Sequence, residues 1–219
     1  DNLFEACHYG VYLSQSHGAR VVNNIMRFSV FQFPHRDTSF AEVLPYCVYL
    51  DNSYDFQLEG NSFKVFNSGR NSNFITGVIV NDGFSNEEQI YRNTVFFMRV
   101  AIEAIGLNRD SQFAQKGLQV RCNDLASNGN DVFVTNNLDN PYPPGYPVGI
   151  AGNQGSMSNP AGNKFTKSTA LIHCTNILNT TDHTINYFYH DTTSNNKFYP
   201  DSIVGYVNRV ETVVIHNDS

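Results

Sequence analysis

Histidine and carboxylate side chains gather toward the end of the sequence. The group consists of His173, Asp182, His183, His190 and Asp191. Such side chains bind metals or act as general acids and bases. If one strand joins His183 to His190, these two residues face opposite sides of a sheet, because side chains alternate along a strand. They would then not share a metal ion. The group instead supports a hydrolase hypothesis with His173, His190 and Asp191 as candidate catalytic residues.

The four cysteines, Cys7, Cys47, Cys122 and Cys174, lack the close spacing of a zinc site. Their even number predicts two disulfide bonds. The pairing Cys7–Cys47 with Cys122–Cys174 closes the shortest loops and has the smallest entropic demand. Four reduced, buried thiols are the alternative. His8 follows Cys7, but adjacent residues on a helix point about 100° apart, so they do not form a catalytic thiol pair.

Two groups of oxygen-bearing side chains lie near expected turns. They are Asn81, Asp82, Glu87 and Glu88, and then Asp124, Asn128, Asn130 and Asp131. Neither group follows the order of an EF-hand loop. Asp and Asn also gather in turns for backbone reasons. We therefore expect no cofactor and no metal site, with a bound calcium ion as the alternative. The sequence has no nucleotide-binding glycine motif, no zinc-protease motif and no serine-hydrolase elbow.

A long segment at about 138–165 has no hydrophobic period and is rich in Pro, Gly and Asn. It predicts a surface loop. The Pro-rich first half holds Tyr142 and Tyr146 on a stiff, polyproline-like backbone, and Asn153 and Asn159 follow in the Gly-rich half. Flat aromatic faces beside neutral amides suit the recognition of a sugar or a protein. These four residues are our candidate binding residues. An insertion without a role is the alternative.

Two helices are expected. Leu3, Phe4, Cys7 and Val11 have nearly helical spacing and predict a helix at the N-terminus. A second helix is predicted at about 86–106. There, Ser85 and Glu88 form a capping-box pattern, and apolar residues then recur every three or four positions until Gly106. These recurring apolar residues are Tyr91, Val95, Met98, Ile102 and Ile105.

Most of the remaining pattern is typical of strands. Short runs of β-branched and aromatic residues alternate with polar residues and are separated by Asn, Asp and Gly. Gly60-Asn61 stands between two such runs and predicts a hairpin turn. The expected fold is therefore a β-dominated α+β fold, an antiparallel sheet or sandwich with the two helices, and it forms one domain over residues 1–219.

Composition restricts the possible partners. The formal net charge is −6 and charged residues make up 16% of the chain. No cluster of Lys and Arg is present, which argues against nucleic-acid binding. No apolar run is long enough to predict a membrane span. The chain begins at Asp1 without an apolar leader, which is typical of a processed or trimmed end; a start point chosen by the experimenter is the alternative. Asn179-Thr180-Thr181 is a candidate glycosylation sequence.

These features lead to three functional hypotheses. The first is a non-enzymatic extracellular protein on a cell or virion surface, either a subunit of a fibre, pilus or capsid or an adhesin that recognises glycan or protein. Low charge and abundant Tyr and Asn fit large neutral interfaces. The second is the secreted hydrolase described above. The third is a carrier of a small apolar ligand, which would need a large internal cavity.

Overall fold

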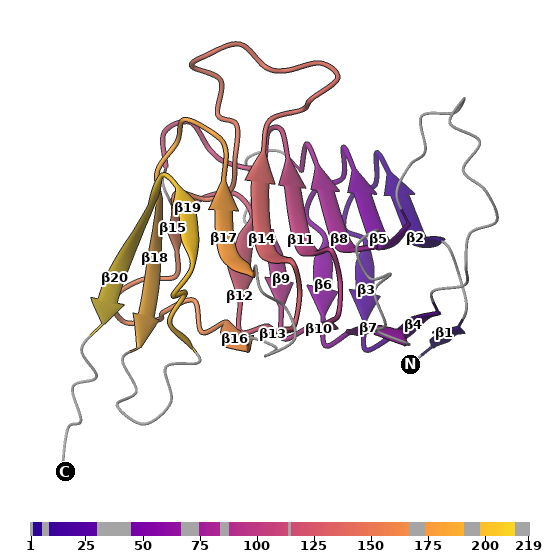
Figure 1. Ribbon diagram of the computed structural model, residues 1–219. Helices are drawn as coiled ribbons and strands as arrows, with labels where there is room; N and C mark the ends of the chain where they lie inside the picture. Colours follow the sequence, from indigo (N-terminus) through magenta and orange to yellow (C-terminus); the bar gives the residue numbers. More distant parts are fainter. Residues whose placement is uncertain are drawn as a thin grey trace.

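The chain winds into a coil of short strands, each followed by a turn into the next face of the coil (Figure 1). The computed structural model describes residues 2–5, 9–29, 45–66, 75–83, 88–113, 115–166, 174–190 and 198–212. Within these ranges it contains strands and no α-helix. Every pair of neighbouring strands in the sheets is parallel, with one strand contributed by each successive coil.

The strands make three faces. The first face is a seven-stranded sheet of β2 (Tyr9–Ser14), β5 (Tyr46–Asp51), β8 (Thr76–Asn81), β11 (Val100–Ile105), β14 (Asn130–Thr135), β17 (Thr175–Asn179) and β19 (Ile203–Gly205). The second face has β3 (Arg20–Val22), β6 (Gln57–Glu59), β9 (Gln89–Tyr91) and β12 (Gln119–Arg121), followed by β15 (Asn153–Gln154), β18 (Ile185–His190) and β20 (Val207–Thr212). The third face has β1 (Leu3–Glu5), β4 (Ile25–Ser29), β7 (Ser62–Phe66), β10 (Thr94–Phe96), β13 (Asp124–Ala126) and β16 (Lys164–Thr166). This arrangement is a parallel β-helix.

Columns of apolar side chains fill the interior of the coil, with one member from each turn. On the third face the column consists of Met26, Phe63, Val95, Leu125 and Phe165, which are paired in register and buried. Because each strand covers the one before it, apolar burial accumulates along the stack, as in other solenoid proteins. The strands can therefore be very short and still be stable.

A ladder of asparagines runs along the second corner, where the chain passes from the second face to the third. Its members are Asn2, Asn24, Asn61, Asn93, Asn123 and Asn163. From Asn24 onward, the Oδ1 of each member accepts hydrogen bonds from the backbone and the side-chain amide of the previous member. For example, the backbone nitrogen and Nδ2 of Asn61 both lie 3.0 Å from Asn93 Oδ1. The residues before the last five members have left-handed φ angles between 55° and 67°, so each corner is a tight turn that ends in a buried Asn.

The predicted helices are wrong. Leu3 and Phe4 lie in β1 and Val11 lies in β2, whereas Cys7 lies outside the described residues. The range 86–106 contains β9, β10 and β11 in place of the central helix. Alternation within short strands, interrupted by tight corners, places buried residues three or four positions apart and so imitates a helical period. Glu88, expected at a helix cap, is fully buried instead.

The predicted antiparallel sheet and its hairpin are also wrong. Gly60-Asn61 is a corner of the coil, and the strands on either side of it, β6 and β7, belong to different faces. A hairpin turn and this corner use the same residue types, because both need a left-handed residue and a side chain that bonds to the local backbone.

Neither expected disulfide bond is present among the described residues. Cys122 has a free thiol at the second corner, where its φ is 56°, while Cys174 directly precedes β17 at another corner. Cys47 is free and buried in β5, and its expected partner Cys7 lies outside the described residues. Stacking of the coil, rather than covalent bonds, holds these segments together.

Candidate binding site

The first corner follows the seven-stranded sheet and is regular in the early coils. Gln15, Asn52, Asp82 and Gly106 each follow a strand of this sheet with a left-handed φ between 47° and 72°. The regularity ends after β14, where the chain leaves the corner and forms a loop from residue 136 to β15 (Figure 1). This loop contains the two tyrosines that the sequence singled out.

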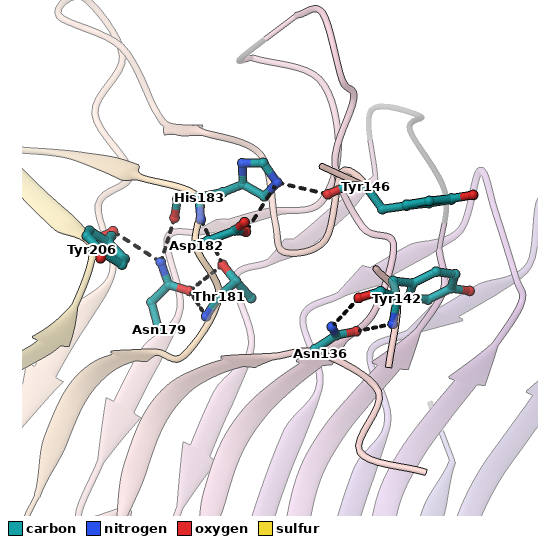
Figure 2. A network of polar contacts seen from close by, with 8 residues as sticks. All are labelled: Asn136, Tyr142, Tyr146, Asn179, Thr181, Asp182, His183 and Tyr206. Atoms are coloured by element: carbon teal, nitrogen blue, oxygen red, sulfur yellow. Dashed lines mark hydrogen bonds and ion pairs between the residues drawn. The ribbon is translucent and has the colours of Figure 1, made fainter. Parts of the chain in front are cut away.

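Asn136 closes the base of this loop. Its Oδ1 accepts hydrogen bonds from the backbone nitrogens of Asn137 at 2.8 Å and Tyr142 at 3.1 Å. Its Nδ2 donates to the carbonyl oxygen of Tyr142 at 3.0 Å (Figure 2). Because one side chain binds the backbone of Tyr142 on both sides, the position of that tyrosine relative to β14 is defined.

The ring of Tyr142 is held from the opposite end by Asp82. The Tyr142 hydroxyl donates to Asp82 Oδ2 at 3.1 Å, and Asp82 Oδ1 accepts the backbone N–H of Leu107 at 2.7 Å. Gly106 lies under the ring, and a Cβ there would come 3.2 Å from Tyr142 Cε2. Burial, and secondly the Asp82 carboxylate, raise the pKa of Tyr142. The hydroxyl therefore stays protonated as a structural donor.

Tyr146 stacks on Tyr142 and is the more exposed of the two. The ring centroids are 5.8 Å apart with an interplanar angle of 29°, and 50% of Tyr146 is exposed. Its carbonyl oxygen accepts a hydrogen bond from His183 Nε2 at 2.9 Å, so this nitrogen carries the proton. The segment after β17 thus supports the tyrosine pair from the side (Figure 2).

A pocket of about 150 Å³ lies between the tyrosine loop and the segment that follows β17. Its lining consists of Asn136, Tyr142, Pro143, Pro144, Tyr146, Val148, Thr180, Thr181 and Asp182. The pocket is smaller than a typical drug-sized site of roughly 300–1,000 Å³. It therefore suits one small ring-shaped unit, with aromatic and proline faces on one side and hydroxyl and carboxylate groups on the other.

The far wall of the pocket is anchored to the coil. Thr180 Oγ1 donates to the carbonyl oxygen of Val134 at 3.2 Å, and Thr181 Oγ1 donates to Asn179 Oδ1 at 2.8 Å. The Asp182 side chain is 64% exposed and its Oδ1 lies 3.5 Å from His183 Nε2. Asp182 is consequently available to a ligand.

Arg109 balances part of the negative charge at this wall. Burial lowers the pKa of its guanidinium, and the charges of Asp182 and Asp110 act in the opposite direction. Arg109 carries a positive charge, because arginine side chains in proteins remain protonated. The surroundings of the pocket therefore contain both signs of charge, which favours a polar ligand without a large net charge.

The other two candidate binding residues lie elsewhere. Asn153 is in β15 on the second face, where its Oδ1 accepts the side-chain amide of Asn186 at 2.9 Å. Asn159 lies in a turn, and its carbonyl oxygen accepts a hydrogen bond from the Arg121 guanidinium. Neither residue lines the pocket. Of the four candidates, the structure brings Tyr142 and Tyr146 together.

The candidate catalytic residues are not placed as a group. His173 and Asp191 lie outside the described residues, while His190 ends β18 with its Nδ1 2.9 Å from Thr212 Oγ1. Within the described part of the chain, no three His, Cys, Asp or Glu residues gather as metal ligands. Of the first group considered for calcium, Asn81, Asp82, Glu87 and Glu88, Glu87 lies outside the described residues. In the second, the side-chain amides of Asn128 and Asn176 bind the Asp131 carboxylate.

The candidate glycosylation residue is enclosed by the fold. Asn179 is 2% exposed, and its Nδ2 donates to the carbonyl oxygens of His183 at 2.8 Å and Tyr206 at 3.1 Å. In the folded coil this nitrogen is inaccessible to a modifying enzyme.

The sequence did not indicate a site at Asn136, Thr180 or Thr181, and Asp82 and Asp182 were expected in a calcium group and in the histidine–carboxylate group instead of this pocket. All of them directly follow strands of the first face. A row of polar residues just after parallel strands marks one edge of a sheet, but this signal requires knowing that the strands are parallel.

No protein-family model, curated protein or solved structure matches this chain. In the part of the chain that the structure describes, no helix has the length and apolar character needed to cross a membrane.

The anchoring of Tyr142 predicts a local effect. We expect Tyr142→Phe to loosen the loop by about 1 kcal/mol, because one hydrogen bond to a carboxylate is lost. Limited proteolysis should then cut the 136–148 segment faster. Tyr146→Phe is the matched control, since the Tyr146 hydroxyl has no hydrogen-bond partner within the described residues; equal cleavage of both variants would contradict the anchoring.

Proposed function

We propose that this protein is a non-enzymatic extracellular adhesin that binds a glycan at the Tyr142–Tyr146 pocket. The observation that carries the proposal is the stacked tyrosine pair, which borders a pocket lined on its other side by Thr180, Thr181 and Asp182. A sugar ring has apolar C–H faces and a rim of hydroxyls, so it can pack on an aromatic ring while hydrogen bonding to such groups.

The arrangement favours binding over catalysis. The groups that could transfer protons already serve the structure: the Tyr142 hydroxyl donates to Asp82, and His183 Nε2 donates to the Tyr146 carbonyl. Asp182 is the exposed carboxylate of the lining, and the neighbouring hydroxyls of Thr180 and Thr181 already donate to Val134 O and Asn179 Oδ1. The low charge of the chain also suits an extracellular recognition surface.

The proposal predicts that Tyr146→Ala weakens glycan binding at least tenfold, because the exposed aromatic face is removed and tenfold corresponds to about 1.4 kcal/mol. A glycan array identifies the bound sugars, and calorimetry compares the variants. Tyr206→Ala is the matched control, since Tyr206 is 62% exposed outside the pocket. An array without any bound glycan, or equal effects of the two variants, would contradict the proposal.

The remaining hypotheses have less support. The hydrolase hypothesis rests on His173 and Asp191, outside the described residues, and on His190, which is bound to Thr212. A ligand carrier needs internal space, whereas the interior columns are filled by closely stacked side chains.

A further inference from the structure

We propose that the glycan ligand is an uncharged chain of several sugar units, which runs along the first corner from the Tyr142–Tyr146 pocket to a second aromatic contact at Tyr12. This inference rests on the proposed glycan binding and adds the class of ligand and a second binding site. It follows from the way the corner is built between β2 and β14.

The first corner is a straight and regular edge. The backbone nitrogen of Gln15 donates to Asp51 O at 2.9 Å, that of Asn52 to Asn81 O at 2.8 Å, and that of Asp82 to Ile105 O at 3.0 Å. The same left-handed conformation therefore repeats from coil to coil. Such a ladder gives the corner a uniform repeat and little freedom to move.

Two tyrosines are each anchored by a hydrogen bond to a carboxylate of this edge. The Tyr142 hydroxyl donates to Asp82 Oδ2, and the Tyr12 hydroxyl donates to Asp51 Oδ2, both at 3.1 Å. Asn81 connects the two positions, because its Nδ2 donates to Asp51 Oδ1 at 2.8 Å and it directly precedes Asp82. The carboxylates that anchor the two rings therefore lie at the ends of neighbouring strands, β5 and β8.

Tyr12 offers an aromatic surface comparable to that of Tyr146. It is 54% exposed on the outside of the coil. Its ring packs edge-on against Tyr49, with centroids 5.4 Å apart and an interplanar angle of 86°. An aromatic partner and a hydroxyl anchor hold the ring in place, so a ligand that packs on it would have little side-chain entropy to overcome.

The distance between the two contacts requires an extended ligand. Tyr12 reaches Asp51 at the end of β5, and the pocket is lined by residues that follow β14 and β17. At least three strand steps of about 4.8 Å, or about 14 Å in total, therefore separate Tyr12 from the pocket. The Tyr142 ring, which is bound to Asp82 after β8, lies between them. One sugar ring cannot span this length. A chain that lies across the strands can reach both tyrosines.

The charges along the edge select the kind of chain. Asp51, Asp82 and Asp182 all belong to it, and Arg109 beside Asp182 offsets part of their charge. The excess of carboxylates repels a polyanion. Chains of uronic acids or sulfated sugars are therefore disfavoured. Neutral sugars, whose hydroxyls donate to carboxylates and amides, fit the edge.

Calorimetry with neutral cello- and manno-oligosaccharides of one to eight units tests the inference. We expect affinity to rise with length and then level off. Tyr12→Ala should weaken the longest oligosaccharide that binds at least tenfold and change the shortest less than twofold. Tyr146→Ala should weaken every length, and Tyr206→Ala none. Oligogalacturonates of equal length should bind more weakly.

The outcomes separate this inference from the proposed function. If Tyr146→Ala weakens binding but Tyr12→Ala leaves the longest oligosaccharide unaffected, the pocket stands and the extended site is overturned. Tighter binding of oligogalacturonate would overturn the neutral ligand class. If none of the neutral oligosaccharides binds, the extended site is overturned too. Tyr12→Phe, which keeps the ring, should restore most of the affinity and so exclude a folding defect of Tyr12→Ala.

Discussion

Asn93→Ala should lower the free energy of unfolding by about 4 kcal/mol. Asn93 is buried in the centre of the ladder, where its Nδ2 donates to the carbonyl oxygens of Leu58 and Tyr91 and to Asn123 Oδ1. Its Oδ1 accepts two hydrogen bonds from Asn61. Alanine leaves several of these buried groups without partners, and each costs about 1–3 kcal/mol.

Urea unfolding of the wild type and the variant measures this effect. Asn208→Ala is the matched control, because Asn208 is an exposed strand residue whose amide makes one hydrogen bond, to Asn186 Oδ1. We expect that variant to change stability by less than about 0.5 kcal/mol. Equal effects of the two substitutions would mean that the ladder is not an important source of stability.

Glu88→Leu should stabilise the protein at neutral and alkaline pH. Glu88 is 0% exposed, and no side chain within the described residues donates a hydrogen bond to its carboxyl oxygens. By register it stands between Phe56 and Leu118 of the neighbouring coils, both buried. Burial raises the pKa of Glu88 to about 9; to smaller extents, the backbone N–H of Asp55 lowers this pKa and the Asp55 charge raises it. The side chain is therefore protonated in the fold at neutral pH.

The pH dependence has a definite sign. In the unfolded chain Glu88 loses its proton above a pKa of about 4.3, whereas the folded chain keeps it until about pH 9. Because the unfolded state binds fewer protons between these values, stability contributed by Glu88 is complete below pH 4.3 and falls as the pH rises to 9. The full pKa difference corresponds to an upper limit of about 6 kcal/mol.

Unfolding by urea at several values between pH 4.5 and pH 9 measures this decline. Glu88→Leu should remove it and fit the apolar column, so the stability gain over the wild type should grow with pH. Glu211→Gln, at an exposed carboxylate, controls for a general charge effect. If the two variants follow the same pH profile as the wild type, Glu88 is not a buried neutral acid.

The sequence predicted the richness in strands but not their arrangement. The ladder asparagines are 37, 32, 30 and 40 residues apart from Asn24 to Asn163. This variation hides the repeat, because loops of different lengths are inserted between coils. A local signature was nevertheless present, in which a left-handed residue and Asn precede an alternating strand, as in Gly60-Asn61 and Gly162-Asn163.

The helix predicted at about 86–106 illustrates the physical reason for the error. Val95, Met98 and Ile102 are all buried, as predicted, but they come from β10, the turn after it and β11. Three-residue strands are too short to establish a period of two. Stacking on the neighbouring coils decides between an α-helix and short β-strands here, and the local sequence contains no information on that stacking.

The candidate site was half predictable. The prolines and tyrosines of the loop are adjacent in sequence, so their composition indicated a recognition surface around Tyr142 and Tyr146. Asp82 contacts Tyr142 and Asp182 lines the pocket, although these residues are 60 and 40 positions away from Tyr142 in the sequence. Their contribution depends on the order of the strands, and the sequence alone did not reveal that order.

Glycan binding at the tyrosine pair is tested most directly by ¹⁹F NMR of protein labelled with fluorotyrosine and titrated with a neutral oligosaccharide from the array. We predict that the signals of Tyr142 and Tyr146 shift in a saturable manner, while those of Tyr199 and Tyr206 do not. Unchanged Tyr142 and Tyr146 signals at a saturating oligosaccharide concentration would contradict the proposed function.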